Sequence, residues 1–200
     1  MSDSFWDERY AQPEWAYGTE PNDFLREMAG EIPAGPVLSL GEGQGRNAVH
    51  LAALGHAVTA VDRSPVGLAR ARELAGSRRV PITTLEADLE HFDPGPGPWS
   101  AIISIFCHIP SRLQARLYPR LAEVLAPGGV LILEAYTPRQ LGFSTGGPRE
   151  PDLLCSLEGL RPLLRGLILE VGREVDREVR EGAHHQGLSA VVQVRARRPL

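Results

Sequence analysis

The sequence predicts an α/β fold in which helices cover both faces of a mostly parallel sheet. Two observations lead to this class. Short apolar runs typical of strands alternate along the chain with segments of helical periodicity. These runs are apolar throughout instead of alternating with polar residues, which is typical of strands buried on both faces. With 200 residues, the chain has the length of one domain and can bury a core of its own.

The first part of the chain predicts two strand-helix pairs. Residues 37–40 are an apolar run, and residues 47–54 carry apolar or small side chains at helical spacing. A second buried strand is predicted over residues 57–61. Residues 64–75 begin with a serine N-cap and a first-turn proline, so they predict the second helix.

Two further strands are predicted in the middle of the chain. Residues 82–85 form a short β-type run, and residues 100–106 form a longer apolar one. The segment 93–98 between them alternates proline and glycine. Because periodic segments of the same kind continue on both sides, this segment is a surface loop and not a domain linker.

A helix and a fifth strand follow. Residues 111–125 carry leucines on one side of a helix, which Ser111 is expected to cap and Pro119 to kink or split. Pro-Gly-Gly at 127–129 then ends the helix and turns the chain into an apolar strand over residues 130–135.

The last third of the chain changes in character. Leucines at helical spacing predict one more helix over residues 153–164. Residues 188–197 place apolar side chains at period two, which indicates a half-buried strand. Residues 167–180 suit a helix or an edge strand, and we choose the strand because residues 182–187 would form a hairpin loop.

Composition and charge exclude several classes of function. The net charge is −4, and basic residues gather only at Arg195, Arg197 and Arg198, which argues against nucleic acid as a partner. No apolar run approaches the ~20 residues of a membrane span, and a secretory leader is not evident, so a cytoplasmic protein is expected. Cys107 and Cys155 are expected to be buried small hydrophobic residues.

The chemistry begins in residues 37–50, which read VLSLGEGQGRNAVH. Three glycines there join the first strand to the first helix, and they can be read in two registers. Gly41-x-Gly43-x-Gly45 suits S-adenosylmethionine, whereas Gly43-x-Gly45-x-x-Ala48 fits the dinucleotide fingerprint. Either register places the loop at the carboxyl end of a strand, where open parallel sheets bind ligands.

Glu42 separates the two cofactors. In the dinucleotide register its carboxylate would lie beside a pyrophosphate, so like charges would meet. S-adenosylmethionine instead brings a sulfonium and an ammonium, which Glu42 attracts, and a carboxylate that Arg46 can meet. The glycines would let the backbone approach this ligand closely because they lack Cβ atoms.

Polar residues also end the next strands. Asp62 stands at the end of the second strand, where a carboxylate can accept hydrogen bonds from the ribose hydroxyls of either cofactor. Asp88 follows the third strand, and for it both a contact to the adenine amino group and an ordinary exposed loop position stay open. The residues Phe106 to His108 follow the fourth strand.

Taken together, these motifs resemble those of class I S-adenosylmethionine-dependent methyltransferases. LSLGEGQGRN, AVD, EADL, SIFCH and LAPGGVLIL occur in the order and spacing of that family, and the likeness covers nearly the whole chain. FWDERY and AYGTEPNDFL resemble the small bacterial branch akin to tellurite-resistance and thiopurine methyltransferases. The resemblance implies a Rossmann-like three-layer α/β/α sandwich, whose seven-stranded, mostly parallel sheet has its last strand antiparallel.

The resemblance also implies a cofactor site for S-adenosylmethionine. The glycine loop would hold the methionine moiety, the acid after the second strand the ribose, and the Asp-Leu pair after the third strand the adenine. Backbone atoms at the end of the fourth strand would lie beside the methionine. Aromatic residues of the N-terminal segment, Tyr10 among them, would close over the cofactor or, equally, anchor that segment to the core. The cofactor-binding residues are therefore predicted to be Trp6, Tyr17, Gly41, Glu42, Gly43, Gly45, Arg46, Asp62, Arg63, Asp88, Leu89, Ser104, Ile105 and Phe106.

The sequence departs from the family pattern at Ser39. Most class I enzymes carry an acid there, two residues before the first glycine, and it anchors the loop and the cofactor's amino group. We expect Glu42 to compensate in part for that missing acid.

The sequence does not require a particular catalytic residue, because methyl transfer from a sulfonium depends mainly on alignment and desolvation. His108 is the candidate base for an amine or hydroxyl acceptor, with a structural role as the even alternative, whereas a soft anion or thiolate needs no base. No third ligand accompanies His184 and His185, so solvated or substrate-facing histidines are expected there, and no metal. The long loop 137–152 is expected to form a substrate-facing lip.

We expect one methyltransferase domain over residues 1–200. Residues 1–33 would form an N-terminal cap segment, residues 34–136 the cofactor-binding core, and residues 137–200 a substrate-side loop, a helix and the terminal hairpin. The expected reaction moves a methyl group to a small molecule, such as a thiol or a tellurium or selenium oxyanion. The alternatives are an NAD(P)-dependent oxidoreductase and a S-adenosylmethionine-binding protein without catalysis. A monomer or weak homodimer without membrane or nucleic-acid partners is expected.

Overall fold

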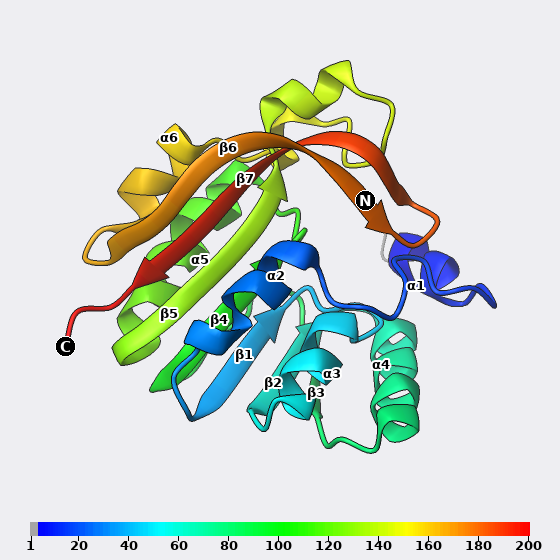
Figure 1. The fold of residues 1–200 in the computed structure, drawn as a ribbon, viewed down its shortest axis with the longest axis horizontal. Helices are drawn as coiled ribbons and strands as arrows, with labels where there is room; N and C mark the ends of the chain where they lie inside the picture. The colour runs from blue at the N-terminus through cyan, green and yellow to red at the C-terminus, as the bar shows by residue number, and fades with distance from the viewer. Residues whose placement is uncertain (1–3) are drawn as a thin grey trace.

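One seven-stranded sheet runs through the centre of the molecule, in a computed structural model that describes residues 4–200 (Figure 1). Its strands lie in the order β3-β2-β1-β4-β5-β7-β6. They are β1 (Pro36–Leu40), β2 (Ala57–Asp62), β3 (Thr83–Glu86), β4 (Trp99–Ile105), β5 (Leu125–Tyr136), β6 (Ile168–Glu181) and β7 (His185–Arg197). Each predicted strand is therefore confirmed, with ends that differ by a few residues.

Helices occupy the connections between the strands. The α-helices are α1 (Ser4–Tyr10), α2 (Asp23–Met28), α3 (Arg46–Ala53), α4 (Pro65–Arg78), α5 (Ser111–Val124) and α6 (Leu157–Leu160). Short 3-10 turns are η1 (Ala29–Glu31), η2 (Pro138–Gly142), η3 (Pro151–Leu153) and η4 (Arg161–Leu164). Ser64 caps α4 as predicted, because its hydroxyl accepts a hydrogen bond from Gly67 N at 3.0 Å. None of the helices in residues 4–200 is long and apolar enough to cross a membrane.

The strand directions confirm the predicted topology. Strand β1 pairs in parallel with β2 and β4, while β3 pairs in parallel with β2, and β5 with β4. Strand β7 runs antiparallel to its two neighbours β5 and β6. The parallel strands consequently end along one edge of the sheet, and the final strand is inserted against their direction. This is the Rossmann-like arrangement that the sequence predicts.

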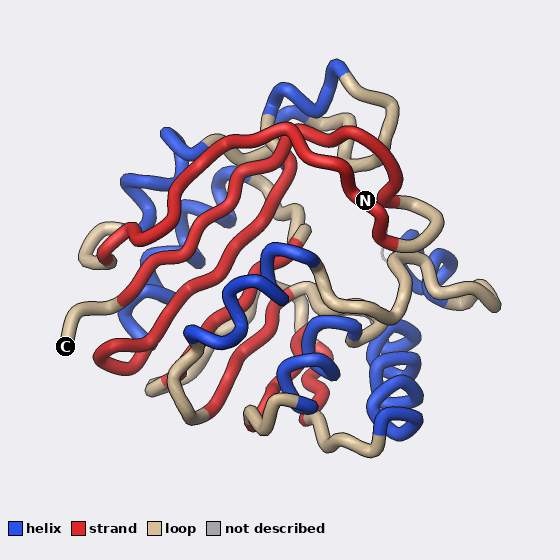
Figure 2. The backbone as a smooth tube through the Cα atoms, in the orientation of Figure 1, coloured by secondary structure: helices blue, strands red, loops and turns tan. Residues whose placement is uncertain are grey.

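Helices cover both faces of the sheet, which gives three layers (Figure 2). Helices α5 and α6 pack over one face, and the core beneath them includes Leu38, Leu117 and Leu160. Helices α2 and α3 pack over the other face, where Phe24 and Val37 are buried. The neighbours Val37 and Leu38 belong to opposite cores because side chains alternate between the two faces of a strand.

The predicted helix over residues 153–164 is wrong. Three short segments, η3, α6 and η4, replace it. Pro162 lies within the predicted span and lacks the N–H that a continuous helix needs, and it stands in the first turn of the separate segment η4. The leucine spacing is real, since Leu160 and Leu164 are both buried, but one straight helix does not produce it.

Helix α5 differs from its prediction in two details. Pro119 lies inside α5 and does not split it. Ser111 is the first helical residue and not the cap, because the cap position belongs to Pro110. The Ser111 hydroxyl instead forms a hydrogen bond of 2.5 Å to Asp152 Oδ1.

Two turns are also placed differently. The Pro-Gly-Gly segment 127–129 lies within β5 and not before it, because β5 begins at Leu125 and the pairing of β4 with β5 shifts register there. The hairpin turn spans residues 182–184, which is shorter than predicted because β7 already begins at His185.

Candidate functional site

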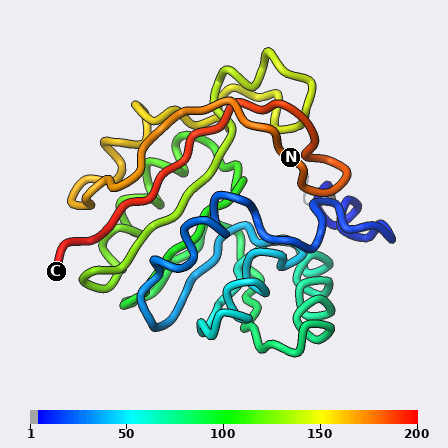
Figure 3. The backbone as a smooth tube through the Cα atoms, in the orientation of Figure 1, coloured from blue at the N-terminus to red at the C-terminus, as the bar shows by residue number. Residues whose placement is uncertain are grey.

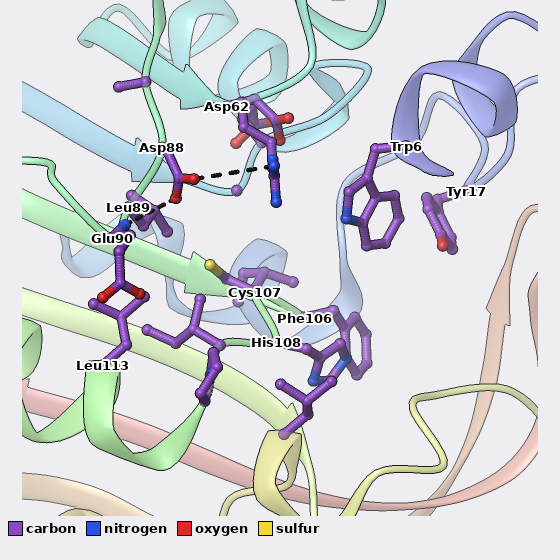
Figure 4. Close-up of a pocket in the computed structure, with 18 of the residues that line it drawn as sticks. Trp6, Tyr17, Asp62, Asp88, Leu89, Glu90, Phe106, Cys107, His108 and Leu113 are labelled. Atoms are coloured by element: carbon purple, nitrogen blue, oxygen red, sulfur yellow. Dashed lines mark hydrogen bonds and ion pairs between the residues drawn. The ribbon is translucent and has the colours of Figure 1, made fainter. Parts of the chain in front are cut away.

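A pocket of about 490 Å³ lies at the carboxyl ends of β1, β2 and β4 (Figure 4). Its walls come from the glycine loop, from the segments that follow β2, β3 and β4, and from the start of α5. The N-terminal segment and β7 add aromatic side chains. All the predicted site residues except Gly43, Gly45 and Ser104 line this pocket. Its volume lies in the range of small-molecule sites.

The loop glycines adopt left-handed backbone conformations, with φ of 58° at Gly41, 60° at Gly43 and 89° at Gly45. Gly43 packs against Tyr10, because a Cβ atom there would lie 2.5 Å from Tyr10 Oη. Gly45 packs against α4, where a Cβ atom would lie 2.6 Å from Cβ of Ala71. The protein itself therefore makes the close approach at these two positions that the sequence analysis attributes to a ligand.

Glu42 is buried at the start of α3, and its carboxylate holds the loop together. Its Oε1 accepts hydrogen bonds from Asn47 N at 3.1 Å and Ala48 N at 2.8 Å. Its Oε2 accepts a hydrogen bond from the Ser39 hydroxyl. Burial raises the pKa of Glu42, and the hydrogen bond from Ser39 partly offsets this effect. Glu42 therefore caps α3, whose N-cap residue Gly45 has no side chain.

Asp62 links the end of β2 to the same loop. Its Oδ2 accepts a hydrogen bond from Gly43 N at 2.7 Å, and its Oδ1 accepts one from Ser64 N at 2.8 Å. Burial raises the pKa of Asp62, and these backbone hydrogen bonds act in the opposite direction. A carboxylate offers about four acceptor positions, so Asp62 retains capacity for ligand hydroxyls while it holds the loop.

The segment after β3 supplies a carboxylate beside an apolar side chain. Asp88 is exposed, whereas Leu89 is buried. Asp88 Oδ1 accepts a hydrogen bond from Glu90 N at 2.9 Å, and its Oδ2 lies 4.0 Å from Arg63 Nη2. Figure 4 shows Asp88, Leu89 and Leu113 on the same side of the pocket. This pairing of an acceptor with an apolar surface is the one predicted to flank adenine.

Strand β4 delivers three further predicted residues. Ser104 is buried away from the pocket, whereas Ile105 and Phe106 line it. Phe106 has φ of 50°, a conformation that residues with a Cβ atom rarely adopt. Its N–H donates a hydrogen bond of 2.7 Å to Glu134 O in the neighbouring strand. Such backbone strain concentrates at functional sites because the surrounding structure must maintain it.

Cys107 and His108 follow directly and are electrically neutral. Burial raises the pKa of the Cys107 thiol to about 12. Burial, with His185 as a second cause, lowers the pKa of His108 to about 3. Neither ring nitrogen of His108 has a hydrogen-bond partner within residues 4–200. An imidazole with so low a pKa is a poor general base near pH 7, so its setting argues against the predicted base role.

The N-terminal segment both anchors itself and reaches the pocket. Tyr10 is buried against the glycine loop and stacks on Trp6, with ring centroids 5.6 Å apart. Trp6 and Tyr17 line the pocket. Tyr17 accepts a hydrogen bond of 2.8 Å from Arg9 Nη1, and its ring lies 4.4 Å from that of His185. Tyr10 thus anchors the segment, whereas closure of Trp6 and Tyr17 over a cofactor stays a prediction.

The adjacent histidines of the hairpin have different surroundings. His184 is exposed, whereas His185 is buried and lines the pocket. Burial lowers the pKa of both imidazoles. In the part of the chain that the structure describes, no group of three or more His, Cys, Asp or Glu side chains is placed to hold a metal ion.

The loop 137–152 does not line the pocket, although Leu153 directly after it does. Gln140 accepts a hydrogen bond of 2.8 Å from a backbone N–H of β7, and Thr145 donates one of 2.7 Å to a backbone carbonyl of the same strand. These bonds fasten the loop to β7. The predicted substrate-facing role of this loop therefore has no support from the pocket lining.

Comparison with known proteins finds a family whose sequence model matches part of the chain. The profile of the methyltransferase domain matches residues 37–129, from β1 through the glycine loop to the Pro-Gly-Gly segment. Residues 37–129, just under half of the chain, are therefore similar to the methyltransferase domain family. The uncharacterized methyltransferase YodH of Bacillus subtilis (strain 168) is 32% identical over 106 residues, which are 53% of this chain and 45% of YodH. The chain spans about half the length of the curated relatives it matches.

Solved structures share the fold of this chain at low sequence identity. A protein described for the conversion of a disulfide bond into a thioacetal group during echinomycin biosynthesis has a TM-score of 0.78 and 22% identity, over 98% of this chain and 90% of that one. The N-methyltransferase NodS from Bradyrhizobium japonicum WM9, in complex with S-adenosyl-L-homocysteine, has a TM-score of 0.71 and 17% identity, over 98% and 97% of the two chains. At these identities the similarity shows the fold alone. The narrower likeness to tellurite-resistance and thiopurine methyltransferases stays a prediction.

The sequence analysis missed a buried ionic network whose members lie mostly outside the matched region. Glu134 in β5 accepts hydrogen bonds from Arg177 Nε at 2.7 Å and Asn22 Nδ2 at 2.5 Å. Glu181 at the end of β6 accepts hydrogen bonds from Arg46 Nη2 at 2.6 Å and Asn22 Nδ2 at 2.8 Å. Its one signal in the sequence is the acidic residue inside the otherwise apolar run of β5.

The pocket is also lined by residues that the sequence analysis did not assign to a site. They follow predicted motifs or begin the next helix, and spacing alone did not single them out. These residues are Asn47, Ala87, Glu90, Cys107, Ile109, Pro110, Arg112, Leu113 and Leu153. Arg112 Nη1 forms an ion pair of 2.5 Å with Glu90 Oε1, so two of these residues are linked to each other.

Proposed function

We propose that this chain binds S-adenosylmethionine in the pocket and moves its methyl group to a small-molecule acceptor. The observation that supports this most directly is the position of Glu42. Its carboxylate occupies backbone N–H groups at the start of α3, where a dinucleotide would place its pyrophosphate. An NAD(P)-dependent oxidoreductase would have to place like charges together at this point.

The charged side chains of the pocket complement the charged and polar groups of S-adenosylmethionine. Glu42 would attract the ammonium group, as the expected substitute for an acid at Ser39, and Arg46 would meet the carboxylate. Asp62 would accept hydrogen bonds from the ribose hydroxyls, and Asp88 would lie beside adenine. Bound there, the cofactor supplies a methyl group already activated on a sulfonium. The chain's own part is to orient the two reactants and to exclude water, which can supply about 7–11 kcal/mol of the barrier in favourable cases.

Thermal unfolding with S-adenosylmethionine, S-adenosylhomocysteine and NADH in parallel tests the cofactor. A ligand that binds only the folded state at 100 times its Kd stabilises it by ~2.7 kcal/mol, so a clear rise in Tm is expected with the two sulfur compounds. NADH should leave Tm unchanged. Stabilisation by NADH alone would show that the alternative, an oxidoreductase, is correct.

The surroundings of the pocket favour an acceptor that loses its proton without help. The pKa of His108 is lowered by burial to about 3, and burial also lowers the pKa of His185. With a pKa this low, the His108 imidazole does not suit proton removal from a hydroxyl or an ammonium group near pH 7. A thiol, with an ordinary pKa of ~8.5, or a tellurium or selenium oxyanion does not need such a base.

Transfer of labelled methyl groups to matched acceptors tests this class. We expect a thiol, selenite or tellurite to be methylated, and the corresponding amine and alcohol to react at least about tenfold more slowly. With a thiol, the rate should rise with pH through the pKa of the thiol itself, without a step near 6.5. Preference for the amine, or a step near 6.5 that His108→Gln abolishes, would contradict this acceptor class. No transfer to any acceptor despite tight cofactor binding would indicate the binding protein without catalysis.

A further inference from the structure

The guanidinium of Arg46 has one nitrogen that forms a hydrogen bond and one that has no partner in the part of the chain that the structure describes. It stands in the first turn of α3 and lines the pocket, yet its side chain is only 8% exposed. Its Nη2 donates a hydrogen bond of 2.6 Å to Glu181 Oε2. Its Nη1 is buried and has no hydrogen-bond partner within residues 4–200. A buried cationic donor without a partner at a pocket wall indicates an anionic group of a ligand.

Glu181 reaches Arg46 from the far end of the chain. It ends β6, outside the matched region 37–129, and its side chain is 4% exposed. Burial alone would raise the pKa of Glu181, but His185, Arg46 and Arg177 lower it well below the ordinary value. The carboxylate is therefore ionised near pH 7. Figure 1 shows the β6-β7 hairpin crossing from the outer edge of the sheet to the N-terminal half of the molecule.

Other members of the network fix the orientation of Glu181. Its Oε1 accepts hydrogen bonds from Asn22 Nδ2 at 2.8 Å and Arg177 Nη2 at 3.0 Å. Arg177 is itself held by Glu134 through two hydrogen bonds of 2.7 and 2.8 Å. Both carboxylate oxygens of Glu181 are thus engaged, and only Oε2 faces Arg46. In this geometry Nη2 of Arg46 is engaged by Glu181, and Nη1 is left without a partner within residues 4–200.

We infer that Glu181 is a positioning residue for the cofactor. It holds Arg46 through Nη2 so that Nη1 is presented to the carboxylate of the methionine part of S-adenosylmethionine. The inference rests on the proposed function, and it adds that the terminal hairpin completes the cofactor site. If Nη1 instead binds an anionic acceptor, Glu181→Gln will leave the binding of S-adenosylhomocysteine unchanged.

Two ligands that differ in the relevant group test the inference by isothermal titration. S-adenosylhomocysteine carries the amino-acid carboxylate, whereas 5′-methylthioadenosine keeps the adenosine and the sulfur but lacks that carboxylate. In Glu181→Gln, the Kd of S-adenosylhomocysteine should rise at least about tenfold, the equivalent of one charge-assisted hydrogen bond. The Kd of 5′-methylthioadenosine should stay within about twofold, which also shows that the variant is folded.

Two further variants make the comparison specific. Glu178→Gln changes an exposed glutamate on the same strand and should leave both dissociation constants unchanged. Arg46→Lys keeps the positive charge beside Glu181 but removes the forked guanidinium, so it should weaken S-adenosylhomocysteine selectively. Unchanged S-adenosylhomocysteine binding in Glu181→Gln, or equal loss for both ligands, overturns the inference while the proposed function stands. If the wild-type protein binds neither ligand, the proposed function fails, and the inference fails with it.

Discussion

At the scale of single residues, Gly45 shows how the neighbours of the glycine loop determine its composition. Its φ of 89° lies in the left-handed region, which costs residues with a Cβ atom free energy. An added Cβ atom would also lie 2.6 Å from Cβ and 2.8 Å from Cα of Ala71. Ala71 lies within α4 and has no flexible side chain to move aside. The two costs therefore act together at this position.

Gly45→Ala is expected to lower the free energy of unfolding by about 1–3 kcal/mol, from backbone strain and from overlap with α4. Urea unfolding measures this change. Gly30→Ala is the matched control, because Gly30 has no atom within 4 Å of an added Cβ and no left-handed φ. The control should change stability by less than about 1 kcal/mol. Equal effects of the two substitutions would show that the close packing of Gly45 against Ala71 does not matter.

At the scale of elements, β5 depends on the hairpin that pairs with it. Glu134 is fully buried in β5. It accepts two hydrogen bonds from Arg177 of β6, one of 2.8 Å from Gln193 of β7, and one from Asn22 ahead of α2. A buried carboxylate without such partners would be strongly destabilising. The network therefore ties the position of the hairpin to the inner part of the sheet.

Glu134→Ala is expected to cost about 3–5 kcal/mol of unfolding free energy, because it leaves the half-buried Arg177 guanidinium without its main partner. Chemical denaturation followed by circular dichroism measures the loss. Glu178→Ala, on the exposed side of β6, should cost less than about 0.5 kcal/mol. A loss below about 1 kcal/mol in Glu134→Ala would mean that the ionic network contributes little to the fold.

At the scale of the whole molecule, the N-terminal segment and the turn of the β6-β7 hairpin meet beside the pocket. Figure 3 shows the turn of the β6-β7 hairpin next to the N-terminal segment. His184 N donates a hydrogen bond of 3.3 Å to Ala16 O, and an added Cβ on Gly182 would lie 2.5 Å from Tyr17 Cα. Trp6, from the same N-terminal segment, lines the pocket. The part of the site beyond the matched region is therefore assembled from sequence-distant segments.

Trp6→Ala is expected to raise the Kd of S-adenosylhomocysteine about tenfold, or ~1.4 kcal/mol, because it removes an aromatic wall of the pocket. Titration calorimetry measures this directly. Trp15→Ala is the control, since Trp15 packs under Arg70 at 4.1 Å and does not line the pocket. A fall in Tm without any change in Kd for Trp6→Ala would mean that Trp6 is an anchor and not part of the binding wall.

The sequence by itself determined the order of the elements and the location of the site. Strands such as residues 57–61, the capped helix that begins at Ser64, and the loop that contains Glu42 were readable because their signals lie within a few residues of one another. The same local view failed over residues 153–164, where leucine spacing suggested one helix and Pro162 prevents it.

Only the tertiary structure decided how the polar groups of the site are supported. Asn22 and Glu181 are 159 positions apart and share a hydrogen bond, and Arg46 meets Glu181 across 135 positions. No periodicity or spacing rule reaches that far, because such pairs form only after the sheet brings β5, β6 and α3 together. The environment of His108 was likewise hidden, since its lowered pKa comes from burial among side chains of other elements. Local sequence thus specified the glycine loop. Long-range packing specified the ion pairs and the lowered pKa of His108 around it.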